Sequence, residues 1–130
     1  MQLAGRLFAL ACAWTALIVG AALLMPTVAN ARGVETRVHI QEVSGKRAFH
    51  GRILSSRAAC VSGRHVRLYH EVPGPDHVVA TATSHTKGTW RARLANRHYK
   101  RSTYYYARVA PKKLGGSRCA AAKSAYAMTL

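Results

Sequence analysis

The chain has 130 residues, of which 20 are Lys or Arg and only four are Asp or Glu, so its formal net charge at pH 7 is +16. Four acids leave little material for catalysis by paired carboxylates, and no serine stands in a nucleophile elbow. We therefore expect no enzymatic activity and no catalytic residues. The excess of positive charge favours binding to polyanions, without naming one.

The first 31 residues predict export. Arg6 is their only charged residue, and a long apolar stretch (LFALACAWTALIVGAALLM) ends in VANA, with small residues at Ala29 and Ala31. A charged start, an apolar core and a small-residue cleavage site are the signature of a secretory signal peptide. We expect cleavage after Ala31, which leaves residues 32–130 as one secreted domain without a stable membrane span. An uncleaved signal anchor is the alternative.

Two cysteines, Cys60 and Cys119, remain downstream of the expected cleavage site. An even pair in an exported chain predicts one disulfide. The bond would close a loop of about 60 residues. In the chain-entropy model, closing such a loop stabilises the folded state by roughly 4 kcal/mol. A metal or redox pair is the alternative, and the lack of a C-x-x-C spacing disfavours it. Without Arg6 the domain has 19 basic and four acidic residues, a formal net charge of +15.

The domain reads as short strands with turn residues between them, and no segment is long and periodic enough for a helix. Alternating apolar and polar residues predict about seven strands, at residues 34–41, 48–54, 64–70, 78–84, 89–94, 103–110 and 124–130. The turn VPGPDH at 72–77 is among the strongest breaks. Residues 95–102 and 111–118 read as loops. Regularly spaced short strands favour an all-β sandwich.

The most basic stretch is residues 91–113, with eight Lys or Arg residues, three consecutive tyrosines and no acid. We predict that its two strands form a hairpin, in which Tyr105 is the one core residue among the three tyrosines. The residues expected on its outer side are Arg91, Arg93, Tyr104, Tyr106 and Arg108, beside Lys100 and Arg101 in the connecting loop. Cations and aromatic rings on one face favour binding to a polyanion. A merely solubilising face is the alternative.

Export restricts the classes of polyanion that the domain can meet. Anionic cell-wall polymers, acidic polysaccharides, phospholipid headgroups or extracellular DNA remain, and cytoplasmic nucleic acid is not expected. The runner-up function is a protein-recognition module, an adhesin or an inhibitor, that acts through loops such as EVPGPDH at 71–77 and LANRHYKRS at 94–102. The sequence leaves the ligand and the oligomeric state open.

Seven histidines are spread irregularly along the domain, at His39, His50, His65, His70, His77, His85 and His98. A metal site would need three or four of them to converge, and their spacing does not indicate this. We expect solvated histidines, no metal and no cofactor. Since histidine gains charge near pH 6, binding to a polyanion should tighten as the pH falls.

The order of HGRILSSRAACVSGRHVRLYH, TATSHTKGTW and YYYARVAPKK…SRCAAAKSAYAMTL resembles small secreted bacterial domains of the transthyretin-like or carboxypeptidase-regulatory-like family. The resemblance covers about residues 49–130 and rests on Gly51, Cys60, Gly63, Arg64, Val66, Leu68, Tyr69, Gly88, Trp90, Tyr105, Tyr106, Ala107, Val109, Cys119, Ala122 and Ser124. It implies a seven-stranded Ig-like sandwich, free in the medium, and indicates little about the ligand. His85 replaces the acid that the family usually carries in its turn, which predicts a looser turn.

Overall fold

The structure is a computed structural model that describes residues 33–130. The predicted signal peptide, residues 1–31, lies outside the described residues. Within them the chain is all-β, with ten strands and two short 3₁₀ helices. None of the helices in this part of the chain has the length and apolar character needed to cross a membrane.

The elements follow one another in a simple order. The strands are β1 (Thr36–Val43), β2 (Ala48–Ser55), β3 (His65–His70), β4 (His77–Thr83), β5 (Thr89–Arg93), β6 (Tyr104–Val109), β7 (Lys112–Leu114), β8 (Ser117–Cys119), β9 (Ala122–Lys123) and β10 (Ala127–Met128). The helix η1 (Ala58–Cys60) precedes β3, and η2 (Asn96–His98) joins β5 to β6.

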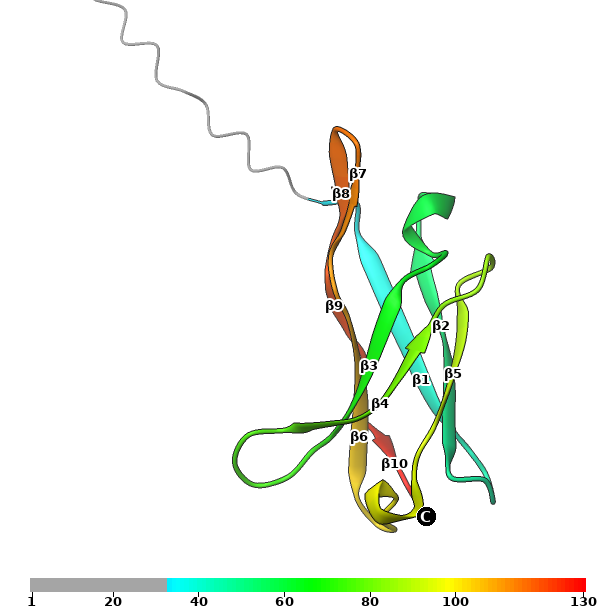
Figure 1. Ribbon diagram of the computed structural model, residues 1–130, viewed down its shortest axis with the longest axis vertical. Helices are drawn as coiled ribbons and strands as arrows, with labels where there is room; N and C mark the ends of the chain where they lie inside the picture. Colours follow the sequence, from blue (N-terminus) through cyan, green and yellow to red (C-terminus); the bar gives the residue numbers. More distant parts are fainter. Residues whose placement is uncertain (1–32) are drawn as a thin grey trace, which may run out of the picture.

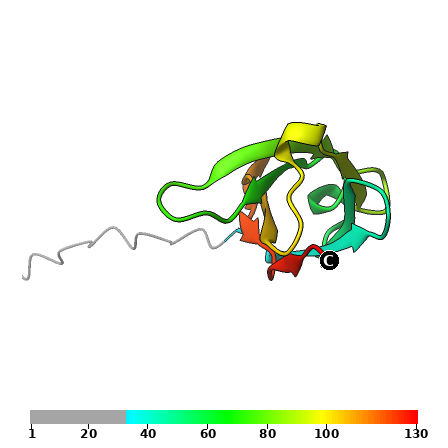
Figure 2. The ribbon, with the colours of Figure 1, turned by 90° about the horizontal axis from the view of Figure 1, so that it is seen from below.

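Two antiparallel sheets face each other (Figure 1). One sheet has the order β1-β2-β5, and the other has the order β10-β6-β3-β4, with β9 also paired to β6. The strands β7 and β8 form a separate hairpin. Seen from the end, the two sheets lie as two layers, one over the other (Figure 2). The predicted all-β sandwich is confirmed.

The core lies between the sheets and uses the residues that the alternation placed inside. The buried cluster consists of Val38, Phe49, Ile53, Trp90, Ala92 and Leu94 from the first sheet and its continuation, and Val66, Leu68, Tyr105, Ala107 and Val109 from the second. Because successive side chains of a strand point to opposite faces, the residues between them reach the solvent side. The period of two therefore predicted the inner faces correctly.

The end of the chain differs from the prediction. Residues 111–118, predicted as a loop, contain the β7–β8 hairpin, and the single strand predicted at 124–130 shrinks to the two residues of β10. A further two-residue strand, β9, pairs with β6. The described residues thus hold ten strands rather than about seven. Gly115, with φ of +49°, lets the short hairpin turn within two residues.

The predicted disulfide between Cys60 and Cys119 is confirmed, with an S–S distance of 2.07 Å. It joins η1 to β8, and both cysteines are fully buried. The bond closes a loop across a sequence separation of 59 residues. In the chain-entropy model a loop of this length contributes about 4 kcal/mol to stability.

Beside the disulfide lies a buried arginine, Arg64, whose side chain is 1% exposed. Its Nη1 donates to the Cys60 carbonyl at 2.7 Å and to Thr36 Oγ1 at 3.2 Å. Its Nη2 donates to the carbonyls of Ala110 at 2.7 Å and Ala120 at 2.8 Å. Desolvation lowers the pKa of this guanidinium. A planar fork with several donors can satisfy carbonyls from separate segments, so Arg64 ties four segments together.

Candidate functional site

The predicted hairpin between β5 and β6 is wrong. β5 pairs with β2 in one sheet, whereas β6 pairs with β3 in the other. The connection through η2 crosses from one layer to the other (Figure 1). Since each sheet turns its apolar side to the shared core, the outward sides of β5 and β6 face in opposite directions.

The predicted site residues are therefore divided between two surfaces. Arg91 and Arg93 point outward from β5, on the first sheet. Tyr104 and Arg108 are exposed on β6, on the second sheet. The single Arg/Tyr face that the sequence predicted does not form, because the alternation assigned each residue to a solvent side but not to a sheet.

Three of the predicted residues do meet, at one end of the sandwich. Arg91, Arg93 and Arg101 line a groove of about 1300 Å³ together with Lys46 and Arg47 from the β1–β2 turn. We call these five cations and the space between them the basic groove. Its other lining residues are Glu42, Ser44, Gly45, Ala48, Tyr99 and Leu130. Figures 1 and 2 place η2 and the C-terminus at this end of the molecule.

The basic groove holds five exposed cations and one acid. That acid is Glu42, whose Oε1 accepts a hydrogen bond from the Tyr99 hydroxyl at 2.5 Å. The hydrogen bond to Glu42 is the main cause that raises the pKa of Tyr99, followed by burial. In residues 33–130 the only ion pair joins Arg37 to Glu35, outside the groove. All five cations of the groove are therefore free to contact a ligand.

The β1–β2 turn presents Lys46 and Arg47. Gly45 adopts φ of +69°, a conformation that suits glycine, and the Lys46 amide donates to the Val43 carbonyl at 3.0 Å. The Arg47 carbonyl accepts a hydrogen bond from the Leu94 amide at 2.8 Å, which fastens the turn to the end of β5. This places the cations of the turn beside those of β5.

The loop after η2 presents Arg101, and a core tyrosine holds that loop. The Tyr105 hydroxyl donates to the His98 carbonyl at 2.8 Å and accepts from the Lys100 amide at 2.9 Å. Thr129 Oγ1 donates to the Lys100 carbonyl at 2.7 Å. Burial raises the pKa of Tyr105, so its hydroxyl keeps the proton that it donates. The loop therefore has a fixed position over the groove.

The prediction that Tyr106 is exposed to solvent is wrong, because the residue is buried and only 1% exposed. It does lie on the outer face of its sheet, but other side chains cover it. Its ring stacks on Tyr69 at a centroid distance of 5.1 Å and meets the edge of Tyr126 at 5.5 Å. Lys123 Nζ lies 4.2 Å from its centroid.

The hydroxyl of Tyr106 donates to Asp76 Oδ2 at 2.6 Å. Burial, with the hydrogen bond to Asp76, raises the pKa of Tyr106 to about 12. The same hydrogen bond, with one from the Val72 amide, holds the pKa of Asp76 below its usual value. Asp76 thus joins the turn before β4 to β6.

Two cations of this second outer face, Arg108 and Lys123, are already engaged with aromatic rings. The Arg108 guanidinium lies 5.3 Å from the Tyr69 centroid and 5.4 Å from that of Tyr106. Lys123 contacts the rings of Tyr106 and Tyr126. Of the remaining predicted residues, Tyr104 packs edge-on to Tyr126, and Lys100 does not line the basic groove. This face offers a ligand fewer free cations than the basic groove does.

Lys46 and Arg47 were missed by the sequence analysis. They lie more than 40 positions before Arg91, and only their adjacency in the turn SGKR marked them as a cationic pair. Which other cations this turn would meet depends on the β2–β5 pairing, in which Ala48 lies opposite Arg93. Such a pairing between distant segments has no local signal in the sequence.

The histidines do not gather. His39, His50, His65, His77 and His85 are exposed, while His70 and His98 are half-buried. The ring of His70 stacks on Tyr105 at 4.8 Å, and burial is the main cause that lowers its pKa. In residues 33–130 no group of three or more His, Cys, Asp or Glu side chains is placed to hold a metal ion.

No protein-family model matches the chain, and no curated protein matches it in sequence. The geometry of the basic groove is therefore the basis for assigning a function.

Proposed function

We propose that the protein is a non-enzymatic, secreted module that binds anionic polymers through the basic groove. The observation that carries this proposal is the convergence of five cations from three separate segments on one groove with a single acid. Arginine suits such a site, because its planar guanidinium binds carboxylate, sulfate and phosphate groups with two parallel hydrogen bonds.

Two features support a ligand outside the cytoplasm. The first 31 residues have the pattern of a secretory signal peptide, and the disulfide is compatible with an extracellular location. The ligands proposed are therefore anionic cell-wall polymers or acidic polysaccharides. Of the residues predicted to bind them, Arg91, Arg93 and Arg101 stay in the proposal, and Lys46 and Arg47 join it.

A binding assay at two salt concentrations tests the proposal. We expect heparin, used as a model polyanion, to bind more weakly as salt rises, because binding releases the counterions of the polymer. Replacing Arg91, Arg93 and Arg101 by serine should reduce the slope of log affinity against log salt by about 2–3, one unit for each lost contact.

The matched control removes the same charge elsewhere. Arg67, Lys113 and Arg118 are exposed and lie outside the basic groove, so their replacement by serine lowers the net charge equally. The control variant should retain most of the affinity. An equal loss in both triple variants would show that only the net charge attracts heparin, and would overturn the assignment to the groove.

A second candidate function rests on the loop between β3 and β4. This loop, residues 71–76, projects from the body of the sandwich (Figures 1 and 2). Hydrogen bonds from the Val72 amide and the Tyr106 hydroxyl to Asp76 anchor its base. An anchored, projecting loop suits recognition of a protein partner. A partner captured at high salt and lost when Pro73 and Pro75 are replaced by glycine would favour this function.

Membership of the transthyretin-like family is part of the same proposal. The residues that carry the resemblance include the disulfide cysteines, the buried Arg64 and the core residue Trp90. Their roles in the described fold are structural. The family would thus account for the scaffold, while the ligand is inferred from the basic groove.

A further inference from the structure

The outer face of the first sheet continues from the basic groove in two cross-strand rows. The register places Gln41, His50 and Arg91 in one row, and His39, Arg52 and Thr89 in the next. All six side chains are exposed. Because residues that lie opposite each other in an antiparallel sheet point to the same face, each row presents its side chains together.

A shallow depression of about 470 Å³ lies over these rows. It is lined by His39, Ile40, Gln41, His50, Gly51, Arg52, Thr89 and Trp90. It adjoins the basic groove, since Arg91 of the groove lies opposite His50 of the depression. Along β2, the distance from Arg47 to Arg52 is roughly 15–20 Å at about 3.3 Å per residue. Groove and depression thus form one track along the sheet.

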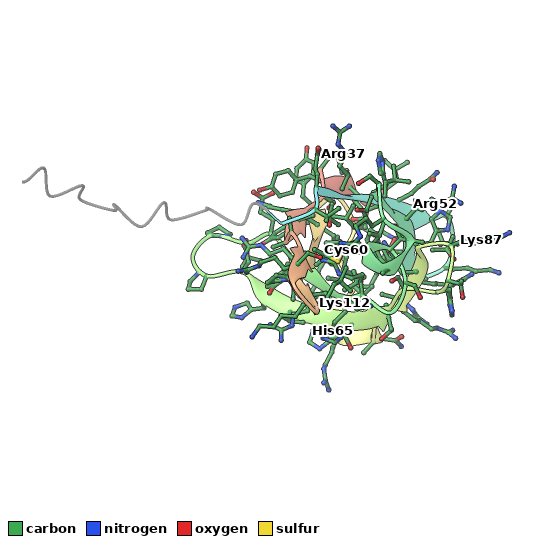
Figure 3. All side chains as sticks on the ribbon, turned by 90° about the horizontal axis from the view of Figure 1, so that it is seen from above. Arg37, Arg52, Cys60, His65, Lys87 and Lys112 are labelled. Carbon is green, nitrogen blue, oxygen red and sulfur yellow. A yellow bond between two sulfur atoms is a disulfide. The ribbon has the colours of Figure 1, made fainter. Side chains whose placement is uncertain are left out.

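Positive charge accompanies the whole track. Arg52 lies opposite His39, and its Nε donates to the Lys87 carbonyl at 3.4 Å. Figure 3 shows Arg37, Arg52 and Lys87 pointing outward on this side of the molecule, with His65 at the opposite side. A compact anion would find enough partners in the basic groove alone, whereas only an elongated ligand can also reach Arg52.

The two histidines on the track face no acid. His50 Nε2 lies 3.4 Å from Gln41 Oε1, with Arg91 on its other side. His39 has Arg52 opposite it and Arg37 two residues before it on β1. Both acids next to this track are already engaged, since Glu35 pairs with Arg37 at 2.9 Å and Glu42 accepts the Tyr99 hydroxyl. A charge gained by His39 or His50 is therefore available to a bound anion.

We propose that the ligand is a linear polyanion that runs from the basic groove across the outer face of β2, where His39, His50 and Arg52 bind its second anionic segment. This inference rests on the proposed function of the groove. It adds that the ligand is elongated. It also adds that only the binding of the second anionic segment depends on pH, because no histidine lines the basic groove. A lower pH raises the affinity for long polyanions and leaves the affinity for short polyanions unchanged.

Heparin oligosaccharides of two lengths test this inference, because their sulfate groups stay ionised throughout the pH range used. The sulfated disaccharide fits the basic groove, and the dodecasaccharide also reaches Arg52. From about pH 7.5 to about pH 5.5 we expect the dodecasaccharide to gain about tenfold in affinity and the disaccharide less than about twofold. The double variant His39→Gln with His50→Gln should abolish this gain.

The double variant His65→Gln with His77→Gln is the matched control, since both histidines are exposed on the other sheet. Its affinity for the dodecasaccharide should rise with falling pH as much as that of the wild type. If both double variants lose this gain equally, or if the disaccharide gains as much as the dodecasaccharide, the inference is overturned and the groove assignment stands. If the Arg91, Arg93 and Arg101 variant binds both probes as well as the wild type does, the proposed function itself fails.

Discussion

At the scale of single residues, the second sheet buries a tyrosine on its solvent side. Tyr106 is 1% exposed because Tyr69 and Tyr126 pack on its ring and Lys123 lies over its face. Its hydroxyl would be costly to bury alone, and Asp76 accepts its hydrogen bond. Asp76, which in the sequence is only a turn residue, thus completes the burial of a side chain 30 positions later.

Replacing Tyr106 by phenylalanine should destabilise the protein at neutral pH. The hydrogen bond lowers the pKa of Asp76 in the folded state, below its usual value of 3.8. Its contribution to stability is therefore present above pH 3.8 and is lost as the pH falls through the folded-state pKa. The gap in melting temperature between wild type and variant should narrow at acid pH, as thermal unfolding followed by circular dichroism can show.

Tyr104→Phe serves as the control for this experiment. Tyr104 is 47% exposed, and its hydroxyl makes no hydrogen bond within the described residues. Its replacement should leave the melting temperature nearly unchanged at either pH. A Tyr106→Phe gap of the same size at neutral and acid pH would mean that Asp76 is not the partner that matters.

At the scale of elements, β2 decides the shape of the first sheet. It lies between β1 and β5, and its midpoint is Gly51. A Cβ atom added to Gly51 would lie 1.8 Å from the His39 carbonyl oxygen and 2.7 Å from Trp90 Cζ2. Neither a neighbouring strand nor a buried indole can move aside easily, so the three strands approach one another only with glycine here.

Gly51→Ala should therefore lower the free energy of unfolding by about 3 kcal/mol or more, as an overpacked core substitution does. Chemical denaturation with urea measures this change. Gly116→Ala is the matched control, because a Cβ there meets nothing within 4 Å, and we expect a change within about 0.5 kcal/mol. Similar small changes in both variants would contradict the close approach at Gly51.

The same scale shows how far the sequence could predict the elements. Alternation in TWRARL and TYYYARVA correctly separated the buried from the exposed side for all but Tyr106. It did not indicate that β5 joins β2 while β6 joins β3. Alternation is a property of one strand, whereas strand pairing depends on contacts between distant segments. The site could therefore be predicted only in part, as Arg91, Arg93 and Arg101.

At the scale of the whole molecule, the disulfide and the basic groove lie at opposite ends. η1 and the β7–β8 hairpin, which carry the disulfide cysteines, lie at the end away from η2 and the C-terminus (Figure 1). The excess of cations works against compactness, since like charges repel in the folded chain. A crosslink that restricts the unfolded chain offsets this repulsion without occupying the groove.

Replacing Cys60 and Cys119 by serine should lower the free energy of unfolding by about 4 kcal/mol, because the unfolded chain regains the freedom of a long loop. Urea denaturation measures this loss, and reduction of the wild type should reproduce it. At a temperature where the variant stays folded, its affinity for heparin should equal that of the wild type. Two free thiols in the native protein would contradict the premise.

The sequence by itself determined the all-β class, the core-facing sides of the strands, the pairing of the only two cysteines downstream of residue 31, and the excess of positive charge. These follow from local periodicity, composition and count. Only the tertiary structure decided that Lys46 and Arg47 meet Arg91, Arg93 and Arg101, and that Tyr106 is covered. The physical reason is that charge proximity and burial depend on strand pairing and on side-chain contacts between segments distant in the sequence, which no local pattern connects.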